Sequence, residues 1–133
     1  MLVMVNTRLI GVGEYQISTE EADVIEARFS TSGSAEGTIG SGRARGDTSN
    51  GFPGDYRVQY WDAAGLLTGD LDLRIEPAGD AYRLTWRHRL ENVRLPAAIG
   101  ELVFEGIGFS TSETSMAIAY WMAEKVSAAS ESR

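Results

Sequence analysis

The chain has 133 residues, with 19 acidic and 12 basic side chains, a net charge of −7 and no cysteine. This length allows one domain with a hydrophobic core of its own. The lack of cysteine excludes disulfides, thiolate catalysis and zinc ribbons, and it is typical of a cytoplasmic protein. The acidic net charge argues against nucleic acid as a partner. The apolar runs are too short for a membrane span, and residues 1–5 lack the features of a signal peptide.

The N-terminal third of the chain predicts four short strands. One of them also carries a helix signal, because Ser18 and Glu21 form a capping box ahead of Ile25 and Phe29, which would share one helical face. The β-propensity of Ile25 and Phe29, and the strands on both sides, favour a strand over this helix. The four predicted strands are 3–10, 12–19, 23–31 and 36–45.

Glycines are frequent in the fourth of these strands, where Gly37, Gly40 and Gly42 precede Arg43 and Arg45. A phosphate-binding loop would need a strand before it, a helix after it and a Lys-Ser or Lys-Thr pair. No helix signal and no such pair follow, so these glycines indicate a bent or bulged strand.

The middle of the chain has the strongest pattern, since apolar and polar side chains alternate along three predicted strands at 55–62, 66–76 and 81–91. A period of two indicates antiparallel strands with one face in the core and the other in water. The side chains predicted to point inward are Tyr56, Val58, Tyr60, Leu71, Leu73, Ile75, Tyr82, Leu84, Trp86, His88 and Leu90.

Turn signals at 63–65 and 77–80 predict how these three strands pair. Both hairpins place apolar residues on the same side of the middle strand, as a single register requires. The predicted pairs are Tyr60 with Leu67, Val58 with Gly69, Tyr56 with Leu71, Ile75 with Tyr82, Leu73 with Leu84, Leu71 with Trp86 and Gly69 with His88.

Two further strands are predicted at 102–110 and 115–125, followed by a solvated tail at 127–133. The short spacing between strands leaves room only for hairpin connections. We therefore expect a single all-β domain at 1–126, an antiparallel eight- to nine-stranded meander barrel that is closed or nearly closed. A two-sheet sandwich is the alternative.

The last predicted strand is apolar on both faces. A flat surface of small residues around one tryptophan predicts a homodimer contact through residues 117–121, and coverage by the N-terminal segment or by a helix is the alternative. Met116, Ile118, Tyr120 and Met122 lie on one face, and Ala117, Ala119, Trp121 and Ala123 lie on the other.

Short glycine and aromatic motifs in the second half of the chain resemble those of small calycin-type barrels, a group that includes lipocalins, fatty-acid-binding proteins and avidins. They also resemble those of the neighbouring allene-oxide-cyclase-like barrels. The N-terminal Gly-x-Trp of lipocalins is absent, because all three tryptophans follow position 60. The resemblance implies an interior that holds a small, mostly apolar molecule. The motifs are Gly54-x-Tyr56-x-Val58, Gly79-x-x-Tyr82-x-Leu84-x-Trp86, Gly106-x-Gly108 and Tyr120-Trp121.

His88 is the only histidine, and it lies in phase with the inward side chains of its strand. It is a candidate hydrogen-bond donor or general acid/base for a bound molecule, with Tyr60 or Tyr82 as a second group. The alternative is a structural histidine at the rim of the barrel.

Inward aromatic residues are the second candidate group. They would either wall a pocket, with their hydroxyl groups orienting a ligand, or fill the core of the barrel. They are Tyr15, Tyr56, Tyr60, Tyr82, Trp86 and Tyr120. The predicted ligand-binding set is Tyr56, Val58, Tyr60, Gly69, Leu71, Leu73, Tyr82, Leu84, Trp86, His88 and Tyr120.

One histidine, no cysteine and outward carboxylates predict no metal site and no cofactor. The sequence thus predicts a soluble barrel that binds a small hydrophobic molecule, with no nucleic-acid or membrane partner. Two alternatives stay open. One is a barrel enzyme of the isomerase, cyclase or hydratase type that uses His88 and tyrosines as acid/base groups. The other is a non-catalytic homo-oligomeric interaction protein with a filled core.

Overall fold

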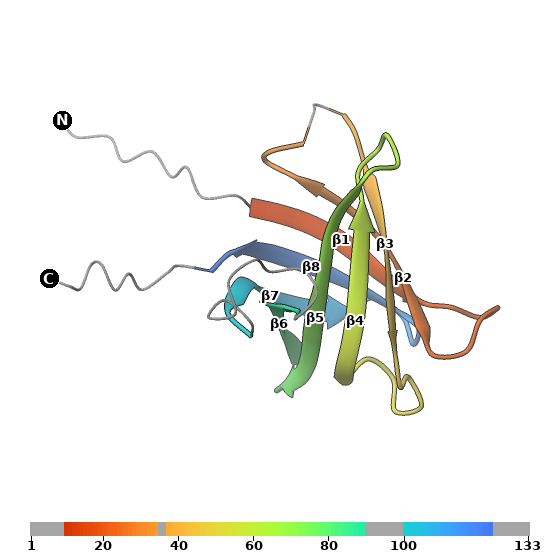
Figure 1. Ribbon diagram of the computed structural model, residues 1–133. Helices are drawn as coiled ribbons and strands as arrows, with labels where there is room; N and C mark the ends of the chain where they lie inside the picture. The colour runs from red at the N-terminus through yellow and green to blue at the C-terminus, as the bar shows by residue number, and fades with distance from the viewer. Residues whose placement is uncertain (1–9, 35–36, 90–99, 124–133) are drawn as a thin grey trace, which may run out of the picture.

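The computed structural model describes residues 10–34, 37–89 and 100–123, which form a closed barrel of eight antiparallel strands (Figure 1). Neighbours in sequence are neighbours in the barrel, and β8 pairs with β1 to close it. The predicted all-β meander barrel is confirmed, and closure leaves no free sheet edge. The strands are β1 (Ile10–Ile17), β2 (Val24–Thr31), β3 (Gly40–Gly46), β4 (Gly54–Trp61), β5 (Leu67–Ala78), β6 (Ala81–His88), β7 (Leu102–Ser110) and β8 (Ser115–Met122).

Some predicted elements fall outside the described residues. These are the strand at 3–10 apart from Ile10, Leu90 in the strand at 81–91, and the tail at 127–133. The strand expected from residue 36 begins at Gly40. Within the described ranges, no helix has the length and apolar character needed to cross a membrane.

The two ends of the barrel differ. We call the end with the β1–β2, β3–β4, β5–β6 and β7–β8 connections the closed end, and the end where β1 begins and β8 finishes the open end. At the closed end, Phe52 of the β3–β4 connection is only 2% exposed. Its carbonyl accepts a hydrogen bond from the Tyr56 hydroxyl (2.8 Å), and its ring lies 6.0 Å from that of Tyr82. The interior at this end is packed.

The predicted register of both middle hairpins is wrong by two residues. Tyr60 lies opposite Gly69, Val58 opposite Leu71, Tyr56 opposite Leu73, Ile75 opposite Leu84, Leu73 opposite Trp86 and Leu71 opposite His88. The β5–β6 turn is shorter than expected, because Ala78 already pairs with Ala81 and Gly79 adopts a φ of 66°. A shift of two residues keeps every side chain on its face, so the inward residues were predicted correctly apart from Leu90, which lies outside the described residues.

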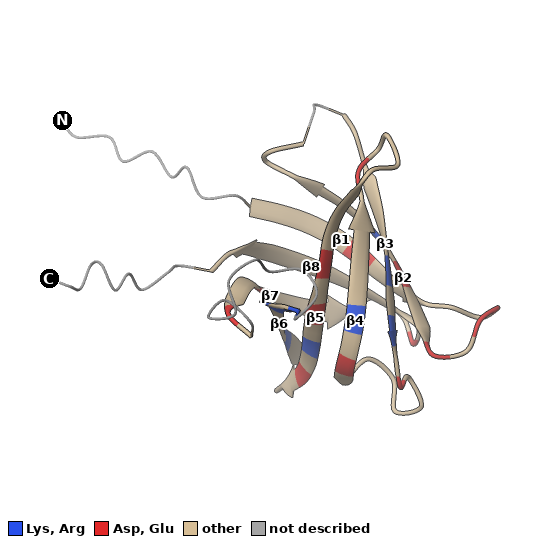
Figure 2. Ribbon diagram, in the orientation of Figure 1, with Lys and Arg blue, Asp and Glu red and all other residues tan. Residues whose placement is uncertain are grey.

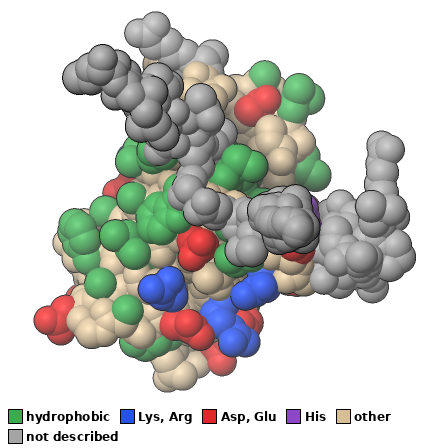
Figure 3. Space-filling model, turned by 90° about the vertical axis from the view of Figure 1, so that its left-hand side faces the viewer, with side chains coloured by type: hydrophobic (Ala, Val, Ile, Leu, Met, Phe, Trp, Pro, Cys, Tyr) green, Lys and Arg blue, Asp and Glu red, His purple; other side chains and the backbone are tan. Residues whose placement is uncertain are grey.

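Charge is unevenly distributed over the outside of the barrel (Figure 2). The strands β1 to β5 carry cross-strand ion pairs such as Arg57–Asp70 (2.7 Å) and Arg74–Asp55 (2.8 Å), and β6 carries Arg83 and Arg87. The strands β1, β7 and β8 contain no charged residue except Glu14 and Glu105. Figure 3 shows apolar side chains gathered over part of one face, apart from the charged ones. The outer wall therefore has a charged part and an apolar part.

The segment with competing helix and strand signals is a strand, β2, preceded by a turn. The Ser18 hydroxyl accepts hydrogen bonds from the backbone N–H groups of Glu20 (3.1 Å) and Glu21 (3.0 Å), as in a helix cap. The chain then departs from a helical path, because Asp23 adopts a φ of 61° and the Ser18 N–H donates to the carbonyl of Val24 (2.9 Å). The hydrogen bonds of the Ser18 hydroxyl, which would cap a helix, therefore stabilise the turn before β2 instead.

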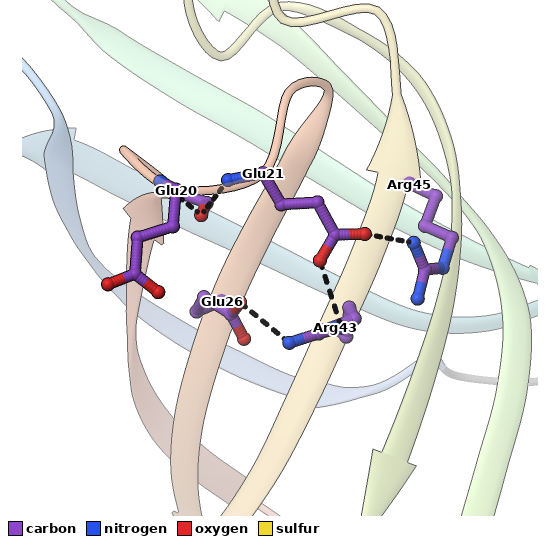
Figure 4. Close-up of polar contacts among 6 residues, drawn as sticks. Glu20, Glu21, Glu26, Arg43 and Arg45 are labelled. Carbon is purple, nitrogen blue, oxygen red and sulfur yellow. Dashed lines mark hydrogen bonds and ion pairs between the residues drawn. The ribbon is translucent and has the colours of Figure 1, made fainter.

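Glu21 does not complete the capping box. Its carboxylate instead pairs with Arg43 (3.3 Å) and Arg45 (3.1 Å) of β3, and Arg43 also pairs with Glu26 of β2 at 2.9 Å (Figure 4). These exposed pairs join the turn to the outer face of β2 and β3, and each contributes little to stability, about 1 kcal/mol at most.

Candidate ligand-binding cavity

A cavity of about 730 Å³ occupies the open half of the barrel. Its volume falls within the range typical of small-molecule sites, about 300–1,000 Å³. Aromatic and aliphatic side chains form its deeper part, and hydroxyl groups, one carboxylate and one imidazole lie around its mouth. The described residues that line it are Phe29, Thr31, Gly33, Ser34, Thr38, Gly40, Tyr60, Asp62, Ala63, Ala64, Thr68, Gly69, Leu71, Trp86, His88, Val103, Phe104 and Tyr120.

Glycines on the inner face explain why this half is hollow. A Cβ atom at Gly42 would lie 2.6 Å from the ring of Tyr60, and one at Gly11 would lie 2.2 Å from the ring of Tyr120. Real Cβ atoms do not approach other atoms this closely, so only glycine allows these rings to lie against the neighbouring strand. Because the rings lie along the wall, they leave the centre of the barrel free.

Three polar atoms form the floor of the cavity. Trp86 Nε1 donates a hydrogen bond to the Tyr60 hydroxyl (2.9 Å), which also shares a 2.5 Å hydrogen bond with the Tyr15 hydroxyl. An indole N–H can only donate, so Tyr60 must accept from Trp86. Tyr15 and Trp86 are almost fully buried. This row of hydrogen bonds separates the cavity from the packed core of the closed end.

Burial keeps the cavity tyrosines in their neutral form. It raises the pKa of Tyr60 to about 12 and raises the pKa of Tyr120 as well. The pKa of Tyr15 lies well above its usual value, first because of burial and then because Tyr60 is close. At neutral pH these groups are hydrogen-bonding phenols, and a phenolate base is disfavoured.

Two groups of aromatic rings lie on opposite sides of the cavity. Phe29 of β2 and Tyr60 of β4 form one group, with ring centroids 5.2 Å apart in an edge-to-face arrangement. Trp86 of β6, Phe104 of β7 and Tyr120 of β8 form the other, with centroids 5.6 to 6.3 Å apart. In an eight-stranded barrel, β3 and β7 face each other across the interior, so the two groups form opposing walls.

The mouth of the cavity is polar. Asp62 begins the β4–β5 connection, and its carboxylate accepts hydrogen bonds from the N–H groups of Ala64 and Leu66 (both 2.9 Å). His88 ends β6, and its backbone is held by hydrogen bonds to Glu101 (3.0 Å) and Gly100 (3.1 Å). No residue in the described ranges forms a hydrogen bond with its imidazole. The histidine backbone is therefore fixed, and the residue lines the cavity.

The predicted ligand-binding residues fall into three places. Six of them line the cavity together: Tyr60, Gly69, Leu71, Trp86, His88 and Tyr120. Four lie in the core beneath it: Tyr56, Val58, Leu73 and Leu84. Tyr82 packs against Phe52 at the closed end. Six residues of strand separate Tyr82 from His88, about 20 Å, so these two side chains do not share the cavity.

Several lining residues were not predicted as site residues. Phe29 lies in a predicted strand that the sequence did not connect to the site. Phe104 lies in phase with Gly106 and Gly108, and this phase is the signal that could have identified it. The polar mouth residues Thr31, Ser34, Thr38 and Asp62 lie in or beside loops, where strand alternation gives no information.

In the described ranges, no cluster of three or more histidine, aspartate or glutamate side chains is placed to hold a metal ion. No family model matches the chain, and neither a curated protein nor a solved structure shows detectable similarity to it.

Proposed function

We propose that this protein binds one small, mostly apolar molecule in the cavity at the open end of the barrel. The observation that carries the proposal is a hollow of about 730 Å³ between two aromatic walls, in a barrel whose other end is packed. Small eight-stranded barrels can be filled by their own side chains or can hold a single ligand. The inner glycines favour the second arrangement here.

The closed eight-stranded antiparallel meander is consistent with a calycin-like barrel at a coarse level. A finer relationship to lipocalins, fatty-acid-binding proteins, avidins or allene-oxide-cyclase-like barrels is part of the proposal. It is supported by the position of the cavity inside the barrel and by the aromatic residues Tyr60, Trp86 and Tyr120 around it.

Binding without catalysis is favoured over an isomerase, cyclase or hydratase. General acid/base catalysis needs groups that change protonation near neutral pH and lie within hydrogen-bond reach of the substrate. The pKa of Tyr60 is raised to about 12, and Tyr82 lies at the other end of the barrel. His88 alone remains as an acid/base candidate. A filled-core interaction protein is less favoured because of the cavity.

The test is native mass spectrometry of the protein purified from its own host, combined with titration by the neutral fluorescent probe Nile red. Gly69→Leu fills the cavity from β5, where an added Cβ would come no closer than 3.4 Å to Tyr60. We expect this variant to lose the bound molecule and most probe binding. Ser41→Leu, on the exposed outer face of β3, is the matched control and should keep both. Equal binding by wild type and Gly69→Leu would contradict a site in this cavity.

We further propose that the apolar part of the outer wall contacts a second copy of this chain. Val12, Ala119 and Ile107 form one apolar row across β1, β8 and β7. The row on each side has two apolar residues and one carboxylate: Glu14, Ala117 and Phe109 on one side, and Ile10, Trp121 and Glu105 on the other. Val12, Ile107 and Phe109 are 59%, 54% and 59% exposed. Contiguous apolar surface of this kind is typical of interfaces.

The size of this face sets how much of a homodimer interface it can supply. Three strands of about eight residues present roughly 14 by 26 Å of surface, or about 360 Å², given the usual strand spacing and rise. This is about half of the 800 Å² or so per partner of a standard interface, so residues around the face must supply the rest. We expect light scattering to give about twice the chain mass of 14.4 kDa and Phe109→Glu to give the single-chain mass. Ser41→Glu is the control. A monomeric wild type would refute this contact.

A further inference from the structure

The walls of the cavity are shaped for flat rings. Phe29 and Tyr60 line one side of the hollow, and Trp86, Phe104 and Tyr120 line the other. The two sides meet at the floor, where Trp86 Nε1 donates to the Tyr60 hydroxyl (2.9 Å). Ring faces and edges on two opposing sides favour stacked and edge-to-face contacts with another ring system. A flexible alkyl chain would also make van der Waals contact with these walls, but it could not form stacked or edge-to-face ring contacts. It would also lose more conformational entropy on binding than a rigid ring system would.

The charge of the lining favours a neutral ligand. Among the described lining residues there is no lysine or arginine, and the one carboxylate, on Asp62, is engaged by the N–H groups of its own loop. A carboxylate ligand placed in this hollow would lose its hydration, and no lysine or arginine among the described lining residues would replace it, which is unfavourable.

Two polar groups remain for the ligand. The Tyr60 hydroxyl is already engaged by Trp86 and Tyr15. Tyr120 and His88 both line the cavity, and neither side chain forms a hydrogen bond with any other residue that the structure describes. A polar atom on the ligand would therefore meet one or both of these groups.

We propose that the cavity selects an uncharged, planar, ring-based molecule that carries a hydroxyl or carbonyl group, and that this group bonds to Tyr120 or His88. Fatty acids and other carboxylates are then poor ligands. This inference rests on the proposed ligand-binding function and adds the chemical class of the ligand to it.

The experiment compares probes with one ring skeleton and different polar groups. Naphthalene, 2-naphthol and 2-naphthoate are titrated into the full chain at pH 7.5, where 2-naphthol is uncharged, and dodecanoate is added as a flexible carboxylate. We expect 2-naphthol to bind about three- to tenfold more tightly than naphthalene, the usual contribution of one hydrogen bond. We expect 2-naphthoate and dodecanoate to bind at least tenfold more weakly than 2-naphthol.

Two variants identify the anchoring group. Tyr120→Phe and His88→Leu should, singly or together, reduce the ratio of the 2-naphthol affinity to the naphthalene affinity to about one. Gly69→Leu should abolish binding of all the ring probes, which locates them in the cavity. Unchanged 2-naphthol affinity in the double variant would overturn the proposed anchors.

The outcomes separate this inference from the function on which it rests. Binding of 2-naphthoate or dodecanoate as tight as that of 2-naphthol would overturn the neutral-ring class and leave ligand binding intact. If no probe bound and no molecule copurified with the protein, the proposed function and this inference would both fail.

Discussion

At the closed end of the barrel, large inner side chains fill the space between the strands and cover the glycines there, such as Gly46 beside Tyr56 and Gly108 beside Met116. At the open end, Gly40 and Gly69 border the cavity instead. The β4–β5 pair shows the change along one hairpin: Tyr56 lies opposite Leu73 near the closed end, and Tyr60 lies opposite Gly69 near the open end. Both ends use the same strands and the same alternation. The size of the inner residues therefore decides which end is packed and which is hollow.

This difference assigns different tasks to the two ends. Nearly all of the fully buried side chains, including Leu73, Leu84 and Met116, lie between the floor of the cavity and the closed end. Stability should therefore depend mainly on the closed end. The open end can keep exposed polar groups and empty volume because the rest of the barrel holds the strands in place.

The largest expected effect contrasts two phenylalanines. Phe52→Ala at the closed end removes an almost fully buried ring, and we expect it to lower the free energy of unfolding by about 3–5 kcal/mol. Phe104→Ala removes a partly exposed ring that already borders empty space, so its cost should be about half as large or less. Urea denaturation measures both. Equal losses would show that the open end contributes to stability as much as the closed end.

The floor between the two ends offers a sharper test. Tyr60→Phe leaves the buried N–H of Trp86 without its acceptor and the Tyr15 hydroxyl without its partner, which should cost about 1–3 kcal/mol. Tyr120→Phe is the matched control. It removes a hydroxyl that no described residue hydrogen-bonds, so we expect a change of less than about 0.5 kcal/mol in urea denaturation. Similar costs for the two variants would mean that the floor is not a structural unit.

The alternation from Tyr56 to His88 was enough to predict the inward faces, because burial imposes a period of two on each strand. It was not enough to predict the position of a residue along the barrel axis. Tyr82 and His88 share a face, yet one lies at the closed end and the other at the mouth. The pairing was wrong because a hairpin register depends on the turn, and the two-residue turn after Ala78 was expected to be longer.

The cavity itself could be predicted only in part. Gly42 creates space because it lies opposite Tyr60 in the β3–β4 pair. The register of this pair is not determined by the local sequence, so the contact could not be predicted. Phe104 belongs to β7, where a register irregularity occurs beside Trp86 and weakens the alternation. The polar mouth is formed by connections, whose conformations depend on contacts such as those of Asp62.

Alkaline pH should destabilise the floor. The pKa of Tyr60 is about 12 in the folded protein, above its ordinary value of about 10 in an unfolded chain. The folded state therefore holds this proton more tightly, so its contribution to stability is complete below pH 10 and is lost as the pH rises towards 12. Urea midpoints measured from pH 9 to 12 should fall, and they should fall less steeply in Tyr60→Phe. A parallel decline in both proteins would exclude the floor as the cause.

The smallest expected effect is that of Gly69→Ala, and it is best compared with Gly42→Ala on the other side of Tyr60. A Cβ at Gly69 would make ordinary contact with the ring at 3.4 Å, whereas one at Gly42 would clash with it at 2.6 Å. Gly69→Ala should therefore raise the free energy of unfolding by about 0.4–1 kcal/mol, because it restricts the unfolded chain without strain in the barrel. Gly42→Ala should lower it by about 1–3 kcal/mol through overpacking. Urea denaturation of the two variants checks whether the free energy of unfolding rises in Gly69→Ala and falls in Gly42→Ala. Gly42 is then the glycine that places the ring against the wall, and Gly69 is the one that keeps the cavity open for a ligand.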